Sequence, residues 1–447
     1  MSIISITGAI YGDEGKAKVA DFISKDADVV VKFQGGSNAG NTAVVDGKEY
    51  ILHVMPVGAI RGIRSLIAAG VVLHPERISE EIDFFNGEVN LGIDPRTELV
   101  FPYHIALDIA RDRSVNQIGT TKQGIGPAYK SSRKEPRFFD LVKGGKHLEE
   151  MIRYNYKIYQ SILEKTYYSS VKVPKGGKYD APLVKISEDE TVARYMDAGK
   201  NLKRYMVDVS KEVRGLIARD KNVLFQGSQG ANLDYRFGNY PKVTCSQPIP
   251  SSIFGNVGIP PMAFKENIGI VKAYTSKVGH GPVVTCLDGN RFPVDEQYSE
   301  DIGIQIRNDG KEFGATTGRK RRVGWLDLVQ LKDRCRICGY TQLAVTKLDV
   351  LGDKGPLKLA VVYEVDGKWD YGYDDYDLDK LYRTKPIYIE EAGFSKQAVI
   401  DAKNFDELPR SAKNYLDTIS RYADVPVTFI STGAEREKTI LNGFRGF

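Results

Sequence analysis

The sequence predicts an α/β fold with a large, mostly parallel central sheet flanked by helices. Two short apolar runs, ISIT at residues 4–7 and DVVVKF at 28–33, are typical of strands buried on both faces. Residues 15–24, which lie between them, can form a helix. A strand, a loop, a helix and a second strand in this order favour parallel strands covered by helices.

Later segments extend this pattern with small antiparallel and helical excursions. Residues 43–55 predict a hairpin whose two-residue turn is Asp46-Gly47. Further buried strands, each followed by glycine or polar residues, are predicted at 222–226, 268–273, 343–346 and 427–430. Neither repeats nor a linker divide the chain, so we interpret 1–447 as a single domain. It has a helical excursion at 140–220 and a surface insertion at 352–415, which holds an acidic, tyrosine-rich hairpin and loop at 369–382.

Composition excludes several classes of protein. A chain of 447 residues with 42% hydrophobic and 27% charged residues predicts a soluble globular protein with a substantial core. There is no apolar run of membrane-spanning length and no signal peptide pattern, so we expect no membrane contact and a cytoplasmic location. The net charge of +5 is too mild to indicate nucleic acid binding. The Cys335–Cys338 pair is interpreted as the apolar face of a helix rather than a zinc or redox site.

The strongest local motif is the segment Gly12–Lys18, directly after the first predicted strand. Glycines allow the backbone to approach phosphates, and the helix that follows offers free N–H groups. Lys16 can neutralise phosphate charge, while Asp13 can take a proton or bind Mg²⁺. The segment is not the usual P-loop, because position 10 is Ile and position 17 is Ala. A plain glycine turn before a helix remains an alternative for this segment taken alone.

Further glycine-rich segments follow other predicted strands or lie between elements. They are residues 34–42, 118–129, 227–230 and 314–322. The last of these contains Arg319 and Arg321, and guanidinium groups bind carboxylates and phosphates bidentately. The alternatives are plain turns for the glycine segments and a solvated face for the basic run. Ligands of open α/β sheets bind beyond the carboxyl ends of the strands, so we expect the chemistry in these loops.

The segment Thr346-Lys347-Leu348-Asp349 is similar to the guanine-reading N/T-K-x-D motif of GTP-binding proteins. One carboxylate can accept from both guanine N1–H and the 2-amino group, which adenine does not offer. A match of four residues is weak alone. Ser431-Thr432-Gly433 ends another predicted strand and could form a second wall for the base.

The chain resembles the adenylosuccinate synthetase family through a series of segments in the family's order, from residue 5 to about residue 440. They are GDEGK, QGGSNAG, IGTTKQGIGPAY, GSQG, KAYTSKVG, EFGATTGRKRRVGW, TKLDVL and STG. The resemblance implies a P-loop-like GTP-binding architecture and a ligase that converts IMP, aspartate and GTP into adenylosuccinate, GDP and phosphate with Mg²⁺. It implies a 6-phosphoryl intermediate and a role in AMP synthesis. It also implies a homodimer in which Arg133 reaches the nucleotide of the neighbouring subunit.

The resemblance also implies roles for individual residues. The catalytic group is Asp13, Lys16 and Asn41. The purine nucleotide is expected at Lys16, Asn38, Thr121, Arg133, Gln229, Thr244 and Arg319, and L-aspartate at Ala315, Thr316, Thr317, Gly318, Arg319 and Arg321. GTP is expected at Gly12, Glu14, Gly15, Lys16, Ala17, Lys18, Gly40, Thr42, Arg321, Lys347, Asp349, Ser431, Thr432 and Gly433. Mg²⁺ is expected at the Asp13 carboxylate and the Gly40 carbonyl.

Three departures from the family pattern leave the substrate open. Asn41 stands where the family has a histidine that acts as an acid, and an amide donates a hydrogen bond but cannot give up a proton near neutral pH. Residues 245–250 replace a run of Ser, Asn and Thr, and Ala17 replaces a glycine. Besides the reaction with IMP, two alternatives therefore stand: a diverged relative acting on another 6-oxopurine nucleotide such as dGMP or GMP, and a GTP-binding protein that has lost turnover.

Overall fold

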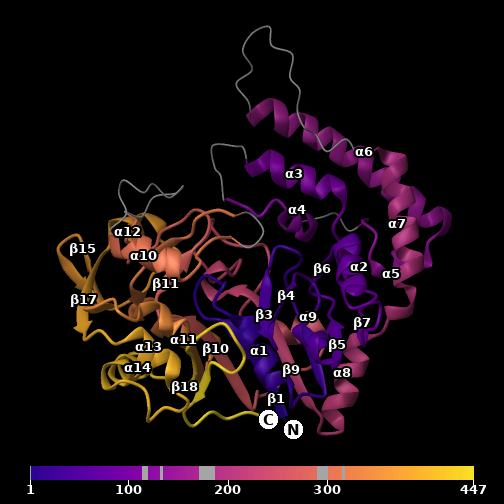
Figure 1. The fold of residues 1–447 in the computed structure, drawn as a ribbon. Helices are drawn as coiled ribbons and strands as arrows, with labels where there is room; N and C mark the ends of the chain where they lie inside the picture. Colours follow the sequence, from indigo (N-terminus) through magenta and orange to yellow (C-terminus); the bar gives the residue numbers. More distant parts are fainter. Residues whose placement is uncertain (1, 113–118, 131–133, 171–186, 289–300, 315–317) are drawn as a thin grey trace.

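The computed structural model describes residues 2–112, 119–130, 134–170, 187–288, 301–314 and 318–447. Its centre is a nine-stranded sheet in the order β19-β18-β14-β10-β1-β9-β2-β5-β7. Every neighbouring pair in this sheet is parallel except β18 with β19. The predicted fold class is therefore confirmed, and helices lie on both faces of the sheet (Figure 1).

The sheet places the amino-terminal strand in its middle. Its members are β1 (Ser2–Gly8), β2 (Val29–Lys32), β5 (Arg64–Ile67), β7 (Leu91–Ile93), β9 (Asn222–Gly230), β10 (Glu266–Lys272), β14 (Gln342–Thr346), β18 (Val427–Ser431) and β19 (Thr439–Leu441). Ile4 and Ile6 of β1 pack on the face covered by α1 (Lys16–Ser24), while Ile3 packs with the residues of α8 (Val209–Ala218) on the other. Both faces of β1 are buried, which is why the run ISIT carries no polar alternation.

The predicted hairpin is confirmed. β3 (Asn41–Val45) pairs with β4 (Lys48–Leu52), and Asp46 and Gly47 at the turn have φ angles of 50° and 75°. Two successive positive φ angles are those of the turn that Asp-Gly favours. The hairpin carries Asn41 at its first position, directly after the loop that follows β2.

Helices gather at one side of the molecule (Figure 1). They include α2 (Pro75–Phe84), α3 (Pro102–Asp112), α4 (Ile125–Tyr129), α5 (Phe138–Lys143), α6 (Gly145–Ser170) and α7 (Glu188–Leu202). Apolar residues of these helices other than α4 form one cluster with β7 and the hairpin, to which Phe101, Leu148 and Tyr195 contribute. The remaining helices are α9 (Ser252–Val257), α10 (Asp301–Asp309), α11 (Leu328–Cys338), α12 (Leu378–Arg383), α13 (Lys396–Asp401) and α14 (Arg410–Ala423). No helix of the described ranges is long and apolar enough to cross a membrane.

A smaller sheet lies at the opposite side of the molecule. It contains β13 (Leu326–Asp327), β15 (Leu357–Val365), β16 (Lys368–Asp370) and β17 (Lys385–Glu391). The tyrosine-rich stretch begins with the predicted hairpin, in which β16 pairs with β15, and continues through a loop into α12. Tyr373 is buried, and its hydroxyl lies 2.7 Å from Gln330 Nε2 and 2.8 Å from Asn239 Nδ2. Short strands complete the fold: β6 (Val72–Leu73) with β8 (Glu98–Leu99), and β11 (Thr275–Lys277) with β12 (Arg322–Gly324).

Two further predictions concern β9 and α11. The segment Gly227–Gly230 was predicted as a loop after the strand, and this is wrong, because β9 continues through Gly230 and pairs with Gly8 after an irregularity in register.

Cys335 and Cys338 lie buried on α11, as predicted. Burial raises the pKa of the Cys338 thiol to about 12. Both thiols therefore belong to the core, where they pack with Leu331.

Candidate active site

The glycine-rich segments meet at the edge of the sheet where the parallel strands end. The Thr346 hydroxyl at the end of β14 donates to the Glu14 carbonyl after β1 at 2.8 Å. Gln229 Nε2 at the end of β9 donates to Asn38 Oδ1 after β2 at 3.1 Å. Four segments that are far apart in the sequence therefore share one site, as expected for an open α/β sheet.

The loop between β1 and α1 closes on a buried carboxylate. Glu14 accepts from the Ile10 amide at 2.8 Å and from Lys16 Nζ at 3.2 Å, and both Glu14 and Lys16 are buried. The loop backbone also packs against β9, because a Cβ on Gly12 would lie 3.2 Å from the Gln229 backbone, and Gly12 has a φ of 87°. Gly15 precedes α1 without a side-chain cap, so the first N–H groups of this helix are available to an anion.

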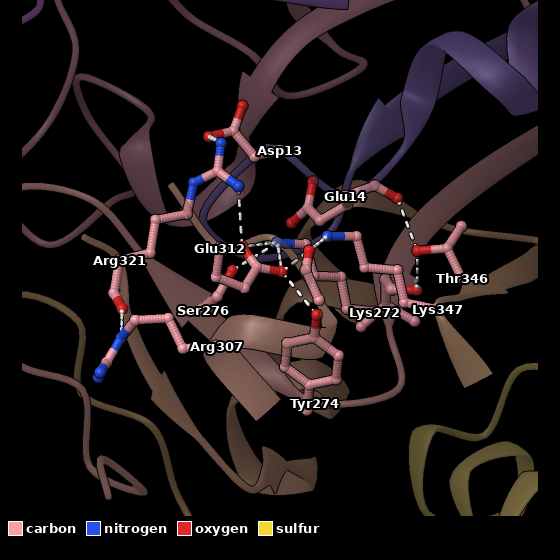
Figure 2. A network of polar contacts seen from close by, with 12 residues as sticks. Asp13, Glu14, Lys272, Tyr274, Ser276, Arg307, Glu312, Arg321, Thr346 and Lys347 are labelled. Atoms are coloured by element: carbon pink, nitrogen blue, oxygen red, sulfur yellow. Dashed lines mark hydrogen bonds and ion pairs between the residues drawn. The ribbon is translucent and has the colours of Figure 1, made fainter. Parts of the chain in front are cut away.

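Asp13 points out of this loop. Its φ is 56°, a left-handed conformation that Asp tolerates better than most residues, and its side chain is 38% exposed. The carboxylate is paired with Arg321 at 2.7 Å (Figure 2). The sequence predicted both residues for the site, and the structure brings them into direct contact.

Arg321 has a second carboxylate partner, Glu312, at 2.8 Å. Glu312 is fully buried and also accepts from Lys272 and Lys347, at 2.7 and 2.9 Å. Burial alone would raise the pKa of Glu312, but the charges of Lys272, Lys347 and Arg321 outweigh it and hold that pKa well below its ordinary value. The acid is therefore ionised, and it organises the cations around it.

Residues predicted for the purine nucleotide lie in two groups, each held together by hydrogen bonds. Gln229 and Thr244 both contact Ser246, with oxygen–oxygen distances of 3.5 and 3.4 Å. Because Gln229 also holds Asn38, these side chains line one polar wall. Arg319 forms a second wall by donating to the carbonyls of Gly119 and Thr120, at 2.9 and 2.7 Å. Thr121, the next residue along that loop, is partly buried.

Asn41 sits at the start of β3 with its amide group buried. Its residue is 4% exposed, and its Nδ2 is one of the buried nitrogen atoms of the described chain that have no hydrogen-bond partner. Buried polar groups are nearly always paired, so the unpaired amide N–H next to Gly40 is a donor that a substrate could engage. This is the position at which the sequence departs from the family's histidine.

Lys18 contacts two of the residues predicted to enclose guanine, Ser431 and Gly433. Its Nζ donates to Ser431 Oγ at 2.7 Å, to the Gly433 carbonyl at 2.8 Å and to the Lys438 carbonyl at 2.7 Å. All three N–H donors of the ammonium group are thus used to hold the segment after β18 against α1. Lys18 reaches this segment rather than the loop after β1, so its contribution to GTP binding would be indirect.

We expect Lys18→Met to weaken the binding of a fluorescent GDP analogue by about tenfold, because the loss of three hydrogen bonds frees Ser431–Gly433 from α1. Lys25→Met is the matched control, since Lys25 is an exposed lysine at the other end of the same helix. Equal affinities for the two variants, measured by fluorescence titration, would contradict this role of Lys18.

The same lysine should leave a signature in the pH dependence of stability. Burial lowers the pKa of Lys18 to about 7, below the ordinary lysine value of about 10.4. Between these values the unfolded chain binds more protons than the folded chain, so this lysine makes the folded protein gain stability as the pH rises from 7 to about 10. Urea unfolding should show a smaller gain for Lys18→Met than for the wild type; equal gains would contradict the assignment.

The remaining predicted residues are placed as follows. Lys347 Nζ donates to the Gly310 carbonyl at 2.6 Å and also contacts Glu312. Asp349 is half-buried, and this burial raises the pKa of its carboxyl group. Thr432 is buried, and its hydroxyl is also among the unpartnered buried atoms of the described chain. Ala17 is buried in α1, Thr42 is exposed on β3, and Gly318 is exposed. Arg133, Ala315, Thr316 and Thr317 lie outside the described residues.

Sequence reasoning missed Glu312, Lys272 and Tyr274, which form the buried polar group beneath Arg321. One signal was present: Lys272 ends the apolar strand ENIGIVK, and a lysine in a strand that is buried on both faces needs an acidic partner. The partner itself, Glu312, lies 40 residues away in sequence, and no spacing rule connects the two.

This sheet edge, with its glycine loop before an uncapped helix and its paired aspartate and arginine, defines a nucleotide-dependent α/β enzyme. A profile of the family described as adenylosuccinate synthetase matches residues 5–440. The adenylosuccinate synthetase of Acetivibrio thermocellus is 38% identical over 445 residues, which cover 98% of each chain. The chain therefore belongs to the adenylosuccinate synthetase family. It is a ligase of purine biosynthesis that forms a C–N bond.

Solved structures agree with this assignment. The fully ligated adenylosuccinate synthetase of Plasmodium falciparum superposes with a TM-score of 0.86 and 30% identity, covering 99% of this chain and 100% of that one. The succinoaminodeoxyadenylate synthetase of cyanophage S-2L, bound to dGMP and dATP, has a TM-score of 0.59 and 15% identity, covering 98% and 95%. At that identity the second match shows the fold alone.

Proposed function

We propose that the chain joins L-aspartate to the 6-position of IMP at the expense of GTP, with the residue roles that follow. The observation that carries the proposal is the contact of Asp13 with Arg321 at 2.7 Å. It puts a carboxylate base and an anion-binding guanidinium together at the edge where Gln229 holds Asn38 and Lys18 holds Ser431. A protein that only binds GTP does not need that pair.

The first step needs a base, and Asp13 supplies it. Its carboxylate takes the N1 proton of the hypoxanthine, so the 6-oxygen becomes nucleophilic and attacks the γ-phosphorus of GTP, and GDP leaves. Arg321 moves from Asp13 to substrate anions as they enter, which frees the base. The N–H groups at the start of α1, Lys16 and the unpaired amide of Asn41 surround the transferring phosphoryl group with donors.

The second step displaces the phosphate. The 6-phosphoryl group is a better leaving group than the original oxygen, so the amine of aspartate attacks carbon 6 and phosphate departs. Arg319 and Arg321 hold the carboxylates of aspartate bidentately. Asn38, Gln229 and Thr244 hold the purine nucleotide in register through both steps, as positioned groups do in phosphoryl transfer generally.

The residues at the site fit Mg²⁺. This ion is usually held by one or two carboxylates together with substrate phosphates. Asp13 offers one partly exposed carboxylate, and Gly40 lies in a partly buried loop after β2. When bound, Mg²⁺ would neutralise charge on the phosphates of GTP, with Asp13 and the Gly40 carbonyl as the ligands from this chain.

The substrate is tested by mixing the protein with GTP, Mg²⁺ and aspartate and adding IMP, GMP or dGMP separately. We expect adenylosuccinate, followed by absorbance and mass, with IMP alone. Product only with a guanine nucleotide would support the diverged relative. GDP release with no succinylated purine would leave a GTP-binding protein without ligase turnover.

We expect Asn41→His to raise kcat about tenfold, because an imidazolium can add a positive charge and a transferable proton to the donor that the amide already provides. This gain in kcat should disappear at pH values above the histidine pKa. The kcat of the wild type should show no such fall with rising pH. Stopped assays between pH 6 and pH 9 provide the comparison. Asn41→Ala is the control, and it should lower kcat because the buried donor is lost. An unchanged kcat for Asn41→His would contradict our view that asparagine in place of the family's histidine slows the reaction.

The same proposal includes assembly and location. We infer a cytoplasmic homodimer in which Arg133 reaches the nucleotide of the second copy, as the family resemblance implies, and a single domain over residues 1–447 with 140–220 and 352–415 as excursions. Light scattering on the purified protein measures the mass against the 49.8 kDa of one chain. A mass of one chain at assay concentration would remove the shared arginine from the mechanism.

A further inference from the structure

Glu312 contacts four side chains that come from three parts of the chain. Its carboxylate accepts from Lys272 at 2.7 and 2.8 Å, from the Tyr274 hydroxyl at 2.6 Å, from Arg321 at 2.8 Å and from Lys347 at 2.9 Å. Figure 2 shows these groups converging on the one acid. Glu312 itself is 0% exposed, so it is not positioned to touch a substrate.

The charges around Glu312 are unequal. Lys272 is almost as buried as Glu312 and pairs with it, and Arg321 and Lys347 bring further positive charge, with side chains 8% and 29% exposed. A cation held by a buried acid is costly to displace, because the acid would be left unpaired. Glu312 therefore fixes the two cations that border the site, and these two cations and Lys272 together keep Glu312 ionised.

Arg321 and Lys347 each contact Glu312 with one part of the side chain and can offer another part to a substrate. Arg321 uses Nη1 for Glu312 and Nη2 for Asp13, so Nη2 can exchange Asp13 for a substrate anion while Nη1 stays in place. The backbone of Arg321 is also held, because its amide donates to the Glu312 carbonyl at 2.9 Å and Arg307 Nε donates to its carbonyl at 3.0 Å. Lys347 has its ammonium group tied to Gly310 and Glu312, which leaves its aliphatic stem to cover a base.

We propose that Glu312 is a positioning residue shared by two substrate sites, holding Arg321 for aspartate and Lys347 for the guanine of GTP. The inference rests on the proposed function, since it takes the two substrates from there. It extends that function by assigning the alignment of both to one buried carboxylate, to which the sequence analysis gave no role.

The test is Glu312→Gln, which keeps the shape and removes the charge. KM for aspartate and KM for GTP should both rise about tenfold, as expected for the loss of one charged hydrogen bond at each site, while KM for IMP changes less than threefold. In a Lys347→Met background, Glu312→Gln should add little to KM for GTP and should still raise KM for aspartate. A merely structural role would move all three KM values alike and would add equally in both backgrounds.

Two further variants keep the test decisive. Asp94→Asn is the matched control, because Asp94 is another buried acid, 1% exposed and paired with Arg96 at 2.7 Å, away from these residues; its KM values should equal those of the wild type. If Glu312→Gln does not fold, the double variant Glu312→Gln with Lys272→Met removes one buried charge of each sign and should restore folding. It should keep the raised KM for aspartate and for GTP.

The outcomes separate this inference from the proposed function. The first case is that the wild type forms adenylosuccinate. If Glu312→Gln or the double variant then keeps the wild-type KM values, Glu312 has no positioning role. If the wild type forms none, the proposed function fails, and binding of a fluorescent GDP analogue then decides the part that concerns Lys347. About tenfold weaker binding in the variant supports that part, and equal binding overturns it.

Discussion

Asp13→Asn should lower kcat for adenylosuccinate formation by about 10²- to 10⁴-fold, because the amide cannot take the N1 proton from IMP. Asparagine is the appropriate replacement, since it has nearly the same shape and tolerates the φ of 56° that Asp13 adopts. The measurement is the initial rate at saturating IMP, GTP and aspartate. Binding of a fluorescent GDP analogue should remain within a few-fold of the wild type.

A second aspartate in the same backbone conformation provides the control. Asp46 has a φ of 50° at the exposed turn of the β3–β4 hairpin, so Asp46→Asn makes the same chemical change at a similar angle. It should leave kcat unchanged. A rate for Asp13→Asn within threefold of the Asp46→Asn rate would show that another group takes the proton, and the mechanism proposed for the first step would be wrong.

Arg321→Met should lower kcat/KM for aspartate by about 10²- to 10³-fold, because a preorganised charged donor is removed from a largely buried site. The variant also removes the partner that holds Asp13 when substrates are absent. Methionine keeps most of the length of the side chain and leaves Glu312 paired with Lys272 and Lys347, so the fold should survive. Steady-state kinetics with aspartate as the varied substrate measures the effect.

Arg64→Met is the matched control for this variant. Arg64 also pairs bidentately with a carboxylate, that of Glu212 at 2.8 and 2.9 Å, but it lies at the start of β5, at the opposite edge of the parallel sheet from the site. Its variant should bind and turn over aspartate normally, although its melting temperature falls. Comparable losses of kcat/KM in both variants would mean that the effect of Arg321 is general destabilisation.

Much of the framework could be predicted from local sequence because its causes are local. The apolar runs of β1 and β2 have no polar alternation, since both faces of the sheet are covered, and Asp46-Gly47 suits the turn it forms. Gly12 and Gly15 likewise carry the positive φ angles that a tight loop before a helix requires. The continuation of β9 through Gly230 was missed, because glycines usually end strands and here they allow the β1 loop to pack against the strand.

The sequence by itself determined the fold class, the order of the glycine loops and, through the family resemblance, the chemistry expected of Asp13 and Arg319. Only the tertiary structure decided which partner each charged side chain takes. Lys18 holds the segment after β18, Lys347 turns to Glu312, and Arg321 bridges Glu312 and Asp13. The physical reason is range: backbone preferences act over a few residues, whereas a buried charge is satisfied by any opposite charge or hydrogen-bonding group that the fold brings within about 3 Å.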